Sequence, residues 1–296
     1  MLRGLILTPA SEEEMSTVKW RNASLVTPRH AVRRLWNEEA SRRFCAETGE
    51  RIFVVEAMDR IKANNRPLEM KEKFAFAAKT NVAGARKKKD LPDEIELAKG
   101  MKVMVTRNLN TDLDIANGAR GEVVDIILHP DEPPLQDGSI VNLSRLPLCV
   151  LVKLDRTKAT LPGLGEGIVP VEPVTSSTII HVEDDESGAL VPRTVQRRQF
   201  PITAAYGFTD YRSQGQTIPV VIVDIKKPPP PGHLTLCHLY VALSRSHGRD
   251  SIRILRDFEG ELLLQKHDPA LLEEDERLAQ LNEDTKRWWE SLGRGR

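Results

Sequence analysis

Two adjoining stretches decide the fold class: Tyr206-Gly207-Phe208-Thr209-Asp210-Tyr211-Arg212-Ser213-Gln214-Gly215-Gln216-Thr217 and Val220-Val221-Ile222-Val223-Asp224. The second is a continuous apolar run that ends on an acid, which is typical of a strand buried on both faces of a parallel sheet. A predicted helix over 234–246 and a predicted strand over 251–255 follow it. Because strands that alternate with helices favour a parallel sheet, the sequence predicts an α/β fold.

The rest of the chain divides into segments that differ in predicted secondary structure. A short strand at 24–27 and a helix that ends at Thr48-Gly49 continue the α/β pattern, and a further helix is expected over 204–212. Between 97 and 200, Gly/Pro turn signals separate short β-rich runs, with no convincing helix, which predicts a small embedded β-barrel. The runs are Lys102–Thr106, Glu122–Leu128, Leu148–Leu154, Ile168–Val174, Thr178–Val182 and Val195–Phe200.

Composition limits the function classes. The 296 residues carry 43 Lys+Arg and 43 Asp+Glu, so nucleic-acid binding must come from local clusters and not from a basic coat. The length suggests two domains, or one domain with a large insertion. The basic run Arg86–Lys89 is read as a solvated charge run, with a localisation signal or a phosphate contact as alternatives. No apolar stretch is long enough for a membrane span, so we expect a soluble intracellular protein.

Sites defined by short motifs are absent from the sequence. It contains no H-E-x-x-H, nucleophile elbow or paired-cysteine metal set, and we predict no metal site. Cys237-His238 is read as part of an apolar helix, because a single ligand pair does not make a metal site. The glycines at 163–167 are read as a hairpin turn, since no helix follows them as a phosphate loop requires. The chain also contains no G-x-x-x-x-G-K-[S/T], and so no P-loop of its own.

Three segments together resemble the C-terminal motor half of superfamily 1 DNA helicases of the RecD/Pif type, and in detail those encoded by Helitron transposons. Residues 206–217 resemble motif V, "T-x-H-K-S-Q-G-x-T", with Tyr211-Arg212 in place of His-Lys. Residues 238–246 resemble motif VI, "Y-V-A-L-S-R". Residues 97–123 are similar to the "G-x-x-V-M … N-G-x-x-G" stretch that leads into the family's inserted barrel.

The resemblance implies a RecA-like second motor domain, a parallel sheet with flanking helices, with an inserted small SH3-like β-barrel. We expect the motor domain over 24–96 and 200–265 and the barrel over 97–199. An N-terminal extension would cover 1–23, and a charged amphipathic helix would occupy 266–296.

The resemblance also implies site residues. Arg245 would be an arginine finger on the γ-phosphate of ATP, with a structural pairing to a carboxylate as the alternative. Because a finger would point into a cleft, we expect Arg245→Lys to leave stability unchanged. Gln214 and Gly215 would couple the nucleotide to the grip on DNA. Single-stranded DNA would contact Thr209, Tyr211, Arg212 and Ser213, or these would form a solvated helix face, and Thr27, Arg29 and Asn37 are weaker candidates.

The expected function is therefore the C-terminal motor portion of an ATP-dependent helicase that moves 5′ to 3′ on single-stranded DNA. ATP and Mg²⁺ would be shared with a P-loop-containing first motor domain, upstream or in trans, and the chain alone should be inactive as an enzyme. The alternatives are a non-catalytic single-stranded DNA-binding fragment and an inert transposon-derived remnant. No membrane partner is expected, and the family is compatible with a nuclear role in DNA repair, recombination, telomere maintenance or transposition.

Overall fold

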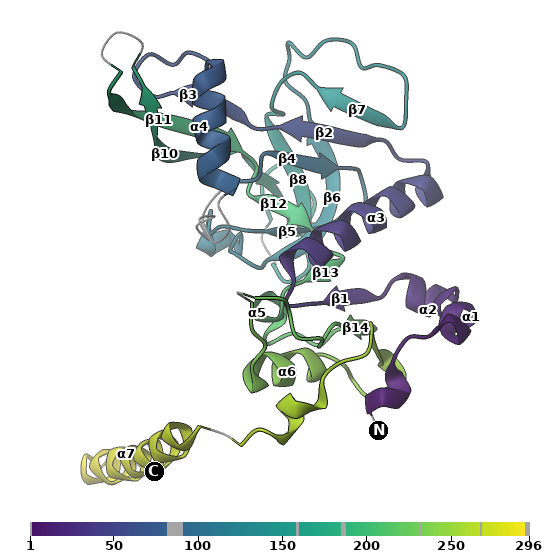
Figure 1. Ribbon diagram of the computed structural model, residues 1–296, viewed down its shortest axis with the longest axis vertical. Helices are drawn as coiled ribbons and strands as arrows, with labels where there is room; N and C mark the ends of the chain where they lie inside the picture. The colour runs from purple at the N-terminus through teal and green to yellow at the C-terminus, as the bar shows by residue number, and fades with distance from the viewer. Residues whose placement is uncertain are drawn as a thin grey trace. The chain divides into compact units, whose positions relative to one another are not determined.

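A computed structural model describes residues 2–81, 91–157, 160–184, 188–230, 232–266 and 268–293. Its contacts divide the chain into two compact units, one made of Met1–Arg29 and Thr209–Arg296, the other of His30–Phe208 (Figure 1). The domain boundaries expected from the sequence follow element type and not contacts, and they stay a prediction. The basic run Arg86–Lys89 lies outside the described residues.

The first unit is built on a parallel sheet in which β14 (Val221–Val223) lies between β1 (Ser24–Val26) and β15 (Ile252–Ile254). All three residues of β14 are buried, as a continuous apolar run requires. Ile6 adds a parallel bridge to Ile254. The parallel sheet predicted from the runs at 220–224 and 251–255 is therefore confirmed.

Helices of the first unit begin at polar caps. The Thr235 hydroxyl accepts the backbone N–H of His238 at the start of α6 (Leu236–Leu243), and the Asp268 carboxylate accepts that of Ala270 at the start of α7 (Pro269–Ser291). Both helices lie where the sequence predicts them. The shorter helices are η1 (Leu2–Leu5), η2 (Pro9–Ser11), α1 (Glu12–Met15), α2 (Val18–Arg21), α5 (Asp210–Ser213), η4 (Arg249–Ser251) and η5 (Gly260–Leu264).

The helix predicted over 204–212 is wrong. This segment instead forms the end of β12 (Ile202–Ala204), the two-residue β13 (Gly207–Phe208) and the single turn of α5. Hydrogen bonds from outside the segment fix it in an extended form, since the Asn37 side chain binds the backbone of Ala204, Tyr206 and Gly207. Tertiary contacts have overridden local preference here.

The second unit contains an antiparallel five-stranded sheet in the order β12-β5-β6-β8-β9. Beside it, a three-stranded sheet pairs β2 antiparallel with β4 and parallel with β7, and buried residues of both sheets share one core. The closure of these strands into a barrel stays a prediction. The bounds are β2 (Ile52–Glu56), β4 (Glu94–Leu97), β5 (Lys102–Val105), η3 (Thr111–Leu113), β6 (Arg120–Ile127), β7 (Ile140–Leu143), β8 (Cys149–Leu154) and β9 (Ile168–Val171).

The helix α3 (His30–Thr48) packs against the core of these sheets. It buries Asn37, Ala40, Ser41 and Cys45, and Cys45 belongs to the shared core. Gly121 lies where β6 passes close to β8, and a Cβ there would come 2.2 Å from the Lys153 carbonyl oxygen. The glycines at 163–167 form the turn between the antiparallel strands β8 and β9, which confirms the hairpin prediction.

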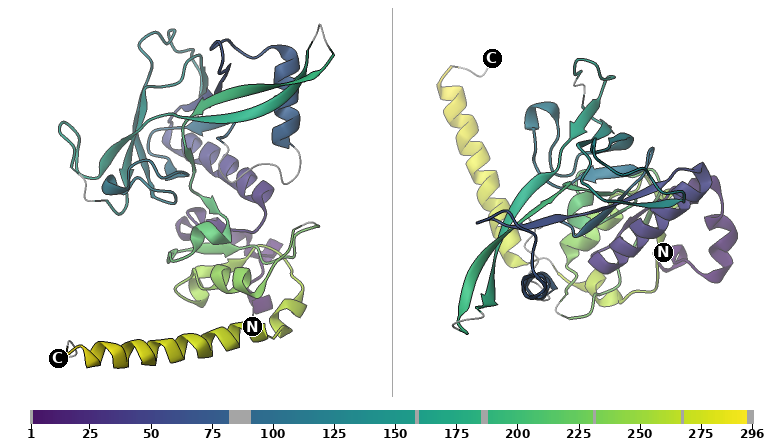
Figure 2. Two further views of the ribbon diagram at one scale, coloured as in Figure 1. Left: turned by 90° about the vertical axis from the view of Figure 1, so that its left-hand side faces the viewer. Right: turned by 90° about the horizontal axis from the view of Figure 1, so that it is seen from above.

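A separate layer packs on its own core, and Figure 2 shows it as a long pair of strands with a helix alongside. It consists of β3 (Met58–Ile61), β10 (Val174–Glu183), β11 (Leu190–Gln199) and α4 (Met70–Asn81). Glu72 of α4 is 1% exposed and accepts two hydrogen bonds of 2.7 Å from the Arg66 guanidinium. The paired Arg66 guanidinium lowers the pKa of Glu72.

Among the described residues, no helix is long and apolar enough to cross a membrane.

Candidate nucleic-acid interface

The carboxyl edge of the parallel sheet is held by a buried carboxylate. Asp224 follows β14, its side chain is fully buried, and its Oδ2 accepts the Thr27 hydroxyl at 3.1 Å. Arg256, beyond β15, donates to the same carboxylate through Nε at 3.1 Å and Nη2 at 2.5 Å. Asp224 thus ties together the segments that follow all three strands.

This network fixes the role of Thr27 in the present geometry. Thr27 is 0% exposed; its hydroxyl donates to Asp224 and accepts the backbone N–H of Arg29 at 3.2 Å. The Arg29 guanidinium donates in turn to the Lys227 carbonyl at 2.7 Å. The Thr27 side chain therefore offers no surface to a nucleic acid, and the geometry does not support the contact predicted for it.

Asn37, on α3 of the second unit, is also buried and fully used. Its Nδ2 donates to the Ala204 carbonyl at 3.0 Å, and its Oδ1 accepts the N–H groups of Tyr206 at 3.1 Å and Gly207 at 2.6 Å. A Cβ at Gly207 would lie 3.2 Å from the Trp36 ring, so the segment packs closely on the helix. In this structure Asn37 positions backbone and presents no free amide to DNA.

The segment 209–217 divides into buried and exposed residues. Ser213 is buried and its hydroxyl donates to the Asp210 carbonyl at 2.8 Å, while Thr209 is buried at the start of α5. Tyr211 is 66% exposed, and Gln214 and Gly215 are exposed as well, Gly215 with a φ of +72°. A left-handed φ of this kind suits glycine, which leaves the backbone of the turn open to an approaching ligand.

Arg212 lies between these two groups. Its side chain is partly buried, and burial lowers the pKa of the guanidinium. An arginine keeps its charge at neutral pH all the same. Of the residues predicted to contact single-stranded DNA, Tyr211 and Arg212 are those whose side chains reach the surface of this segment.

Arg245, just after α6, is 9% exposed and binds backbone carbonyls. Its Nε donates to the Val241 carbonyl at 2.7 Å, and its Nη1 donates to the carbonyls of Ser213 at 2.9 Å and Gln216 at 2.8 Å. Nη2 donates to the Ser244 hydroxyl at 2.8 Å. The guanidinium thus joins the end of α6 to the 209–217 segment. In the part of the chain that the structure describes, no carboxylate lies within ion-pair distance of it.

This placement corrects one expectation. Arg245 does not point into an open cleft in this structure, so Arg245→Lys should not leave stability unchanged. Its backbone is used too, because its carbonyl accepts the N–H of Ile218 at 2.8 Å. The role of the residue at a nucleotide stays a prediction.

Sequence reasoning missed a second joint between α5 and α6. The His238 Nε2 lies 3.0 Å from the Tyr211 hydroxyl and 3.4 Å from Asp210 Oδ2, and its Nδ1 accepts the N–H of Thr235 at 3.1 Å. The spacing Thr235-x-x-His238 at a helix start is the signal that could have found it.

The three thiols differ in exposure. Cys237, beside His238, is exposed, whereas burial raises the thiol pKa of both Cys45 and Cys149.

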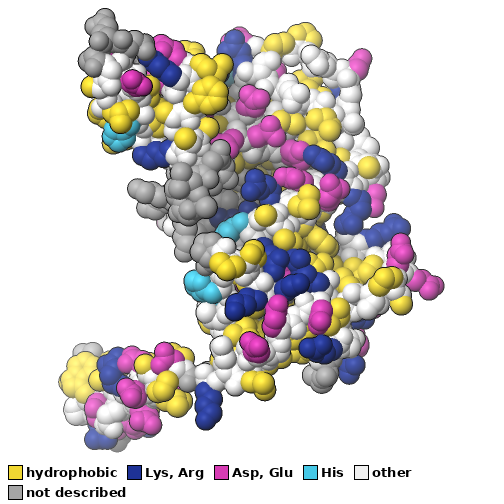
Figure 3. Space-filling model, viewed as in Figure 1, with side chains coloured by type: hydrophobic (Ala, Val, Ile, Leu, Met, Phe, Trp, Pro, Cys, Tyr) yellow, Lys and Arg dark blue, Asp and Glu magenta, His cyan; other side chains and the backbone are white. Residues whose placement is uncertain are grey.

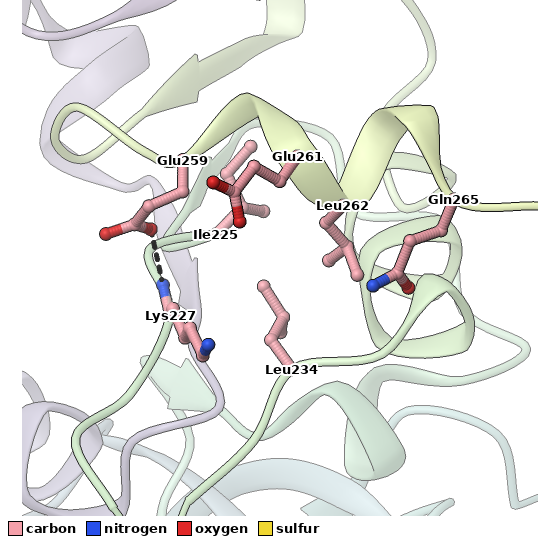
Figure 4. Close-up of a pocket in the computed structure, with 7 residues that line it drawn as sticks. All are labelled: Ile225, Lys227, Leu234, Glu259, Glu261, Leu262 and Gln265. Atoms are coloured by element: carbon pink, nitrogen blue, oxygen red, sulfur yellow. Dashed lines mark hydrogen bonds between the residues drawn. The ribbon is translucent and has the colours of Figure 1, made fainter.

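A small cavity lies elsewhere in the first unit (Figure 4). Its volume is about 80 Å³, far below the 300 Å³ or more of a typical ligand pocket. Leu234 and Leu262 point toward each other across it, and Glu259 accepts the backbone N–H of Lys227 at 3.1 Å. It is too small for a nucleotide. Within the described ranges, no group of three or more His, Cys, Asp or Glu residues could hold a metal ion.

The C-terminal helix α7 carries exposed apolar side chains beside charged ones, as Figure 3 shows at its lower left. Its apolar residues recur at helical spacing and all lie at the surface of the described structure. They are Leu271, Leu272, Leu278, Leu281, Trp288 and Trp289.

Comparison with known proteins gives consistent names. The chain is 26% identical over 220 residues to the ATP-dependent DNA helicase Pif1 of Psychrobacter, which covers 68% of this chain and 32% of the relative. It is 29% identical over 164 residues to PIF7 of Trypanosoma brucei, covering 53% of this chain and 15% of the relative. Over 104 residues it is 36% identical to PIF1 of Candida albicans, covering 35% and 10%. No family model matches the sequence.

The crystal structure of the Candida albicans Pif1 helicase is similar to 94% of this chain, with a TM-score of 0.53 and 21% sequence identity. At that identity the likeness shows a shared fold. The match covers 53% of the crystallised chain, and this chain spans a third or less of the length of the relatives matched by sequence.

Proposed function

We propose, since the chain belongs to the Pif1-like superfamily 1 DNA helicases, that it is the C-terminal motor portion of an ATP-dependent helicase that moves 5′ to 3′ on single-stranded DNA. A P-loop-containing first motor domain, upstream or in trans, supplies the triphosphate cradle and the Mg²⁺ ligands, because the 296 residues contain no P-loop. The five-stranded sheet of the second unit belongs to the inserted SH3-like barrel.

One observation carries this proposal: Arg245 binds the carbonyls of Ser213 and Gln216. The γ-phosphate of ATP offers oxygens that compete for the same planar guanidinium. When Arg245 turns to the phosphate, the segment that carries Tyr211 and Arg212 loses two of its attachments. Nucleotide state and the grip on DNA are then linked through one side chain, with Gln214 and Gly215 in the turn between.

The DNA contact is assigned to the exposed part of the same segment. Tyr211 offers an aromatic face to a base, and Arg212 offers a cation to a phosphate. Thr209 and Ser213 shape the turn from inside, and the turn at Gly215 lets backbone N–H groups approach the strand. We further propose that the protein acts in the cell nucleus, in DNA repair, recombination, telomere maintenance or transposition. Transposition corresponds to the resemblance to Helitron-encoded helicases.

The test has two arms. In the first, the chain is titrated against a fluorescein-labelled oligothymidine at several salt concentrations. Arg212→Ala should flatten the salt dependence, since each neutralised phosphate on a single strand adds about 0.7 to the slope of log K against log salt. Arg34→Ala, an exposed arginine on α3, is the matched control. If Arg212→Ala changes neither affinity nor slope, the helix face is simply solvated.

In the second arm, the chain is joined to a P-loop motor domain from a related helicase and assayed for ATP hydrolysis stimulated by single-stranded DNA. We expect stimulated turnover in the joined protein and none in the chain alone. A joined protein that binds DNA without turnover would favour the non-catalytic DNA-binding fragment. Loss of both properties would favour an inert remnant.

A further inference from the structure

Arg120, the first residue of β6 in the second unit, stacks on an aromatic ring. Its guanidinium carbon lies 3.6 Å from the centroid of the Phe208 ring. At that distance the planar group must lie flat on the ring, because any N–H directed into the face would bring a nitrogen too close. The N–H bonds therefore point sideways, parallel to the ring and past its edge.

These donors have no acceptor. The Nε and Nη2 atoms of Arg120 are buried and form no hydrogen bond with any residue that the structure describes. Asp155 interacts with Arg120 only at longer range, and burial outweighs it, lowering the pKa of Arg120 to about 10. A buried charge without a partner is costly, so such groups normally pair with a counter-charge or with a ligand.

Arg197 of the same unit shows how this chain treats a structural arginine. Its guanidinium also lies over an aromatic ring, that of Phe76, at 4.7 Å. There, however, Asp59 accepts two hydrogen bonds of 2.8 and 2.7 Å, and Asp93 accepts a third. These carboxylates raise the pKa of Arg197. Arg120 has the same stacked position but no carboxylate, which leaves its fork for an anion from outside.

We propose that Arg120 binds a phosphate oxygen of a single-stranded nucleic-acid backbone, as a contact additional to the 209–217 segment. The inference rests on the proposed function. A phosphodiester supplies the planar fork with two oxygens that match parallel N–H donors. Arg120 is half-buried as a whole residue, but Nε and Nη2 are covered, so a strand meets these two donors only when the groups that cover them move aside. Phe208 holds the guanidinium in place before the ligand arrives, which reduces the ordering cost of binding.

The rival explanation is purely structural: the cation stabilises β6 by resting on Phe208. The two readings predict opposite results for Arg120→Met, which keeps the length and apolar stem but removes the charge. If Arg120 awaits a ligand, its unpaired charge destabilises the free protein, and the variant should melt at the same or a higher temperature. If the side chain serves only to stabilise the fold through its cation–π contact with Phe208, the variant should melt at a lower temperature than wild type.

The experiment measures anisotropy of a fluorescein-labelled oligothymidine of about 16 nucleotides, and thermal unfolding without DNA, on the full chain. Arg120→Met should weaken binding by about tenfold and flatten the salt dependence by about 0.7. Arg120→Lys should weaken binding but keep the salt dependence, since the charge remains while the planar fork is gone. Arg51→Met, an exposed arginine of the same unit, is the matched control and should change neither quantity.

The outcomes are separable. If wild type binds and Arg120→Met binds equally well, or melts lower with unchanged affinity, the inference is wrong and the proposed function stands. If wild type does not bind the oligonucleotide, the DNA-binding part of the proposed function fails first, and this inference fails with it. Weaker binding by Arg120→Met without a loss of thermal stability supports the inference.

Discussion

Replacing Arg245 by lysine tests whether this residue is a joint within the first unit as well as a candidate finger. The guanidinium reaches three carbonyls that lie in different directions, those of Val241, Ser213 and Gln216. A lysine ammonium at the end of an unbranched stem can keep one of these hydrogen bonds in place of the planar fork.

The expected loss follows from that geometry. Two of the three carbonyls lose a charged donor, at about 1.5 kcal/mol each. The free energy of unfolding should therefore fall by about 3 kcal/mol, a large part of the 5–15 kcal/mol typical of a folded domain. The measurement is urea unfolding of the full chain, followed by far-UV circular dichroism.

Arg249→Lys is the matched control, because Arg249 is exposed on the first unit and a surface change of this kind should stay within about 0.5 kcal/mol. If Arg245→Lys also stays within that range, the observed hydrogen bonds contribute little and the side chain is held too loosely to join α6 to the 209–217 segment. The link between nucleotide and DNA that we build on this joint would then have no structural basis.

Two further predictions concern the second unit. Glu72→Gln should destabilise the protein at neutral pH, because the Arg66 guanidinium lowers the pKa of Glu72 and folding therefore favours the ionised carboxylate. The difference in stability from wild type should shrink as the pH falls below about 4.5. Urea unfolding at pH 7 and at about pH 3 measures this difference, and a difference that does not depend on pH would contradict the prediction. Gly121→Ala should cost at least about 2 kcal/mol, because the new Cβ would meet the Lys153 carbonyl and push β6 from β8, whereas Gly4→Ala, with open space around it, should be neutral by thermal unfolding; equal melting temperatures would refute the close approach.

The elements that could be predicted from the sequence are those whose side chains are nearly all apolar, because such runs indicate burial directly. The strands at 221–223 and 252–254 are recognisable because nearly every side chain is apolar. The strand Met58–Ile61 was missed because the charged residues Asp59 and Arg60 interrupt the apolar pattern that predicts a strand. It forms because β11 pairs with it. The segment 204–212 failed for the same reason, since its extended form depends on a side chain from a distant helix.

The candidate site divides in the same way. The family resemblance gave Arg245 and the 209–217 segment separate roles, and the hydrogen bonds that join them were not predicted. The family resemblance marked Thr27 and Asn37 as weaker candidates for DNA contacts. Both are buried and satisfied, Thr27 by Asp224 and Asn37 by the backbone at 204–207. Residue type indicates what a side chain can bind, whereas tertiary packing decides whether it is free to do so.

The uneven exposure of the three thiols gives the chain a built-in labelling position. Maleimides react with the thiolate, and burial disfavours the thiolate at Cys45 and Cys149, whereas Cys237 is exposed. A dye added to the unmodified protein will therefore attach first to Cys237, one residue before His238, whose ring contacts Tyr211. A single fluorophore on α6 can then report in real time when the joint between α5 and α6 rearranges, without any engineered cysteine.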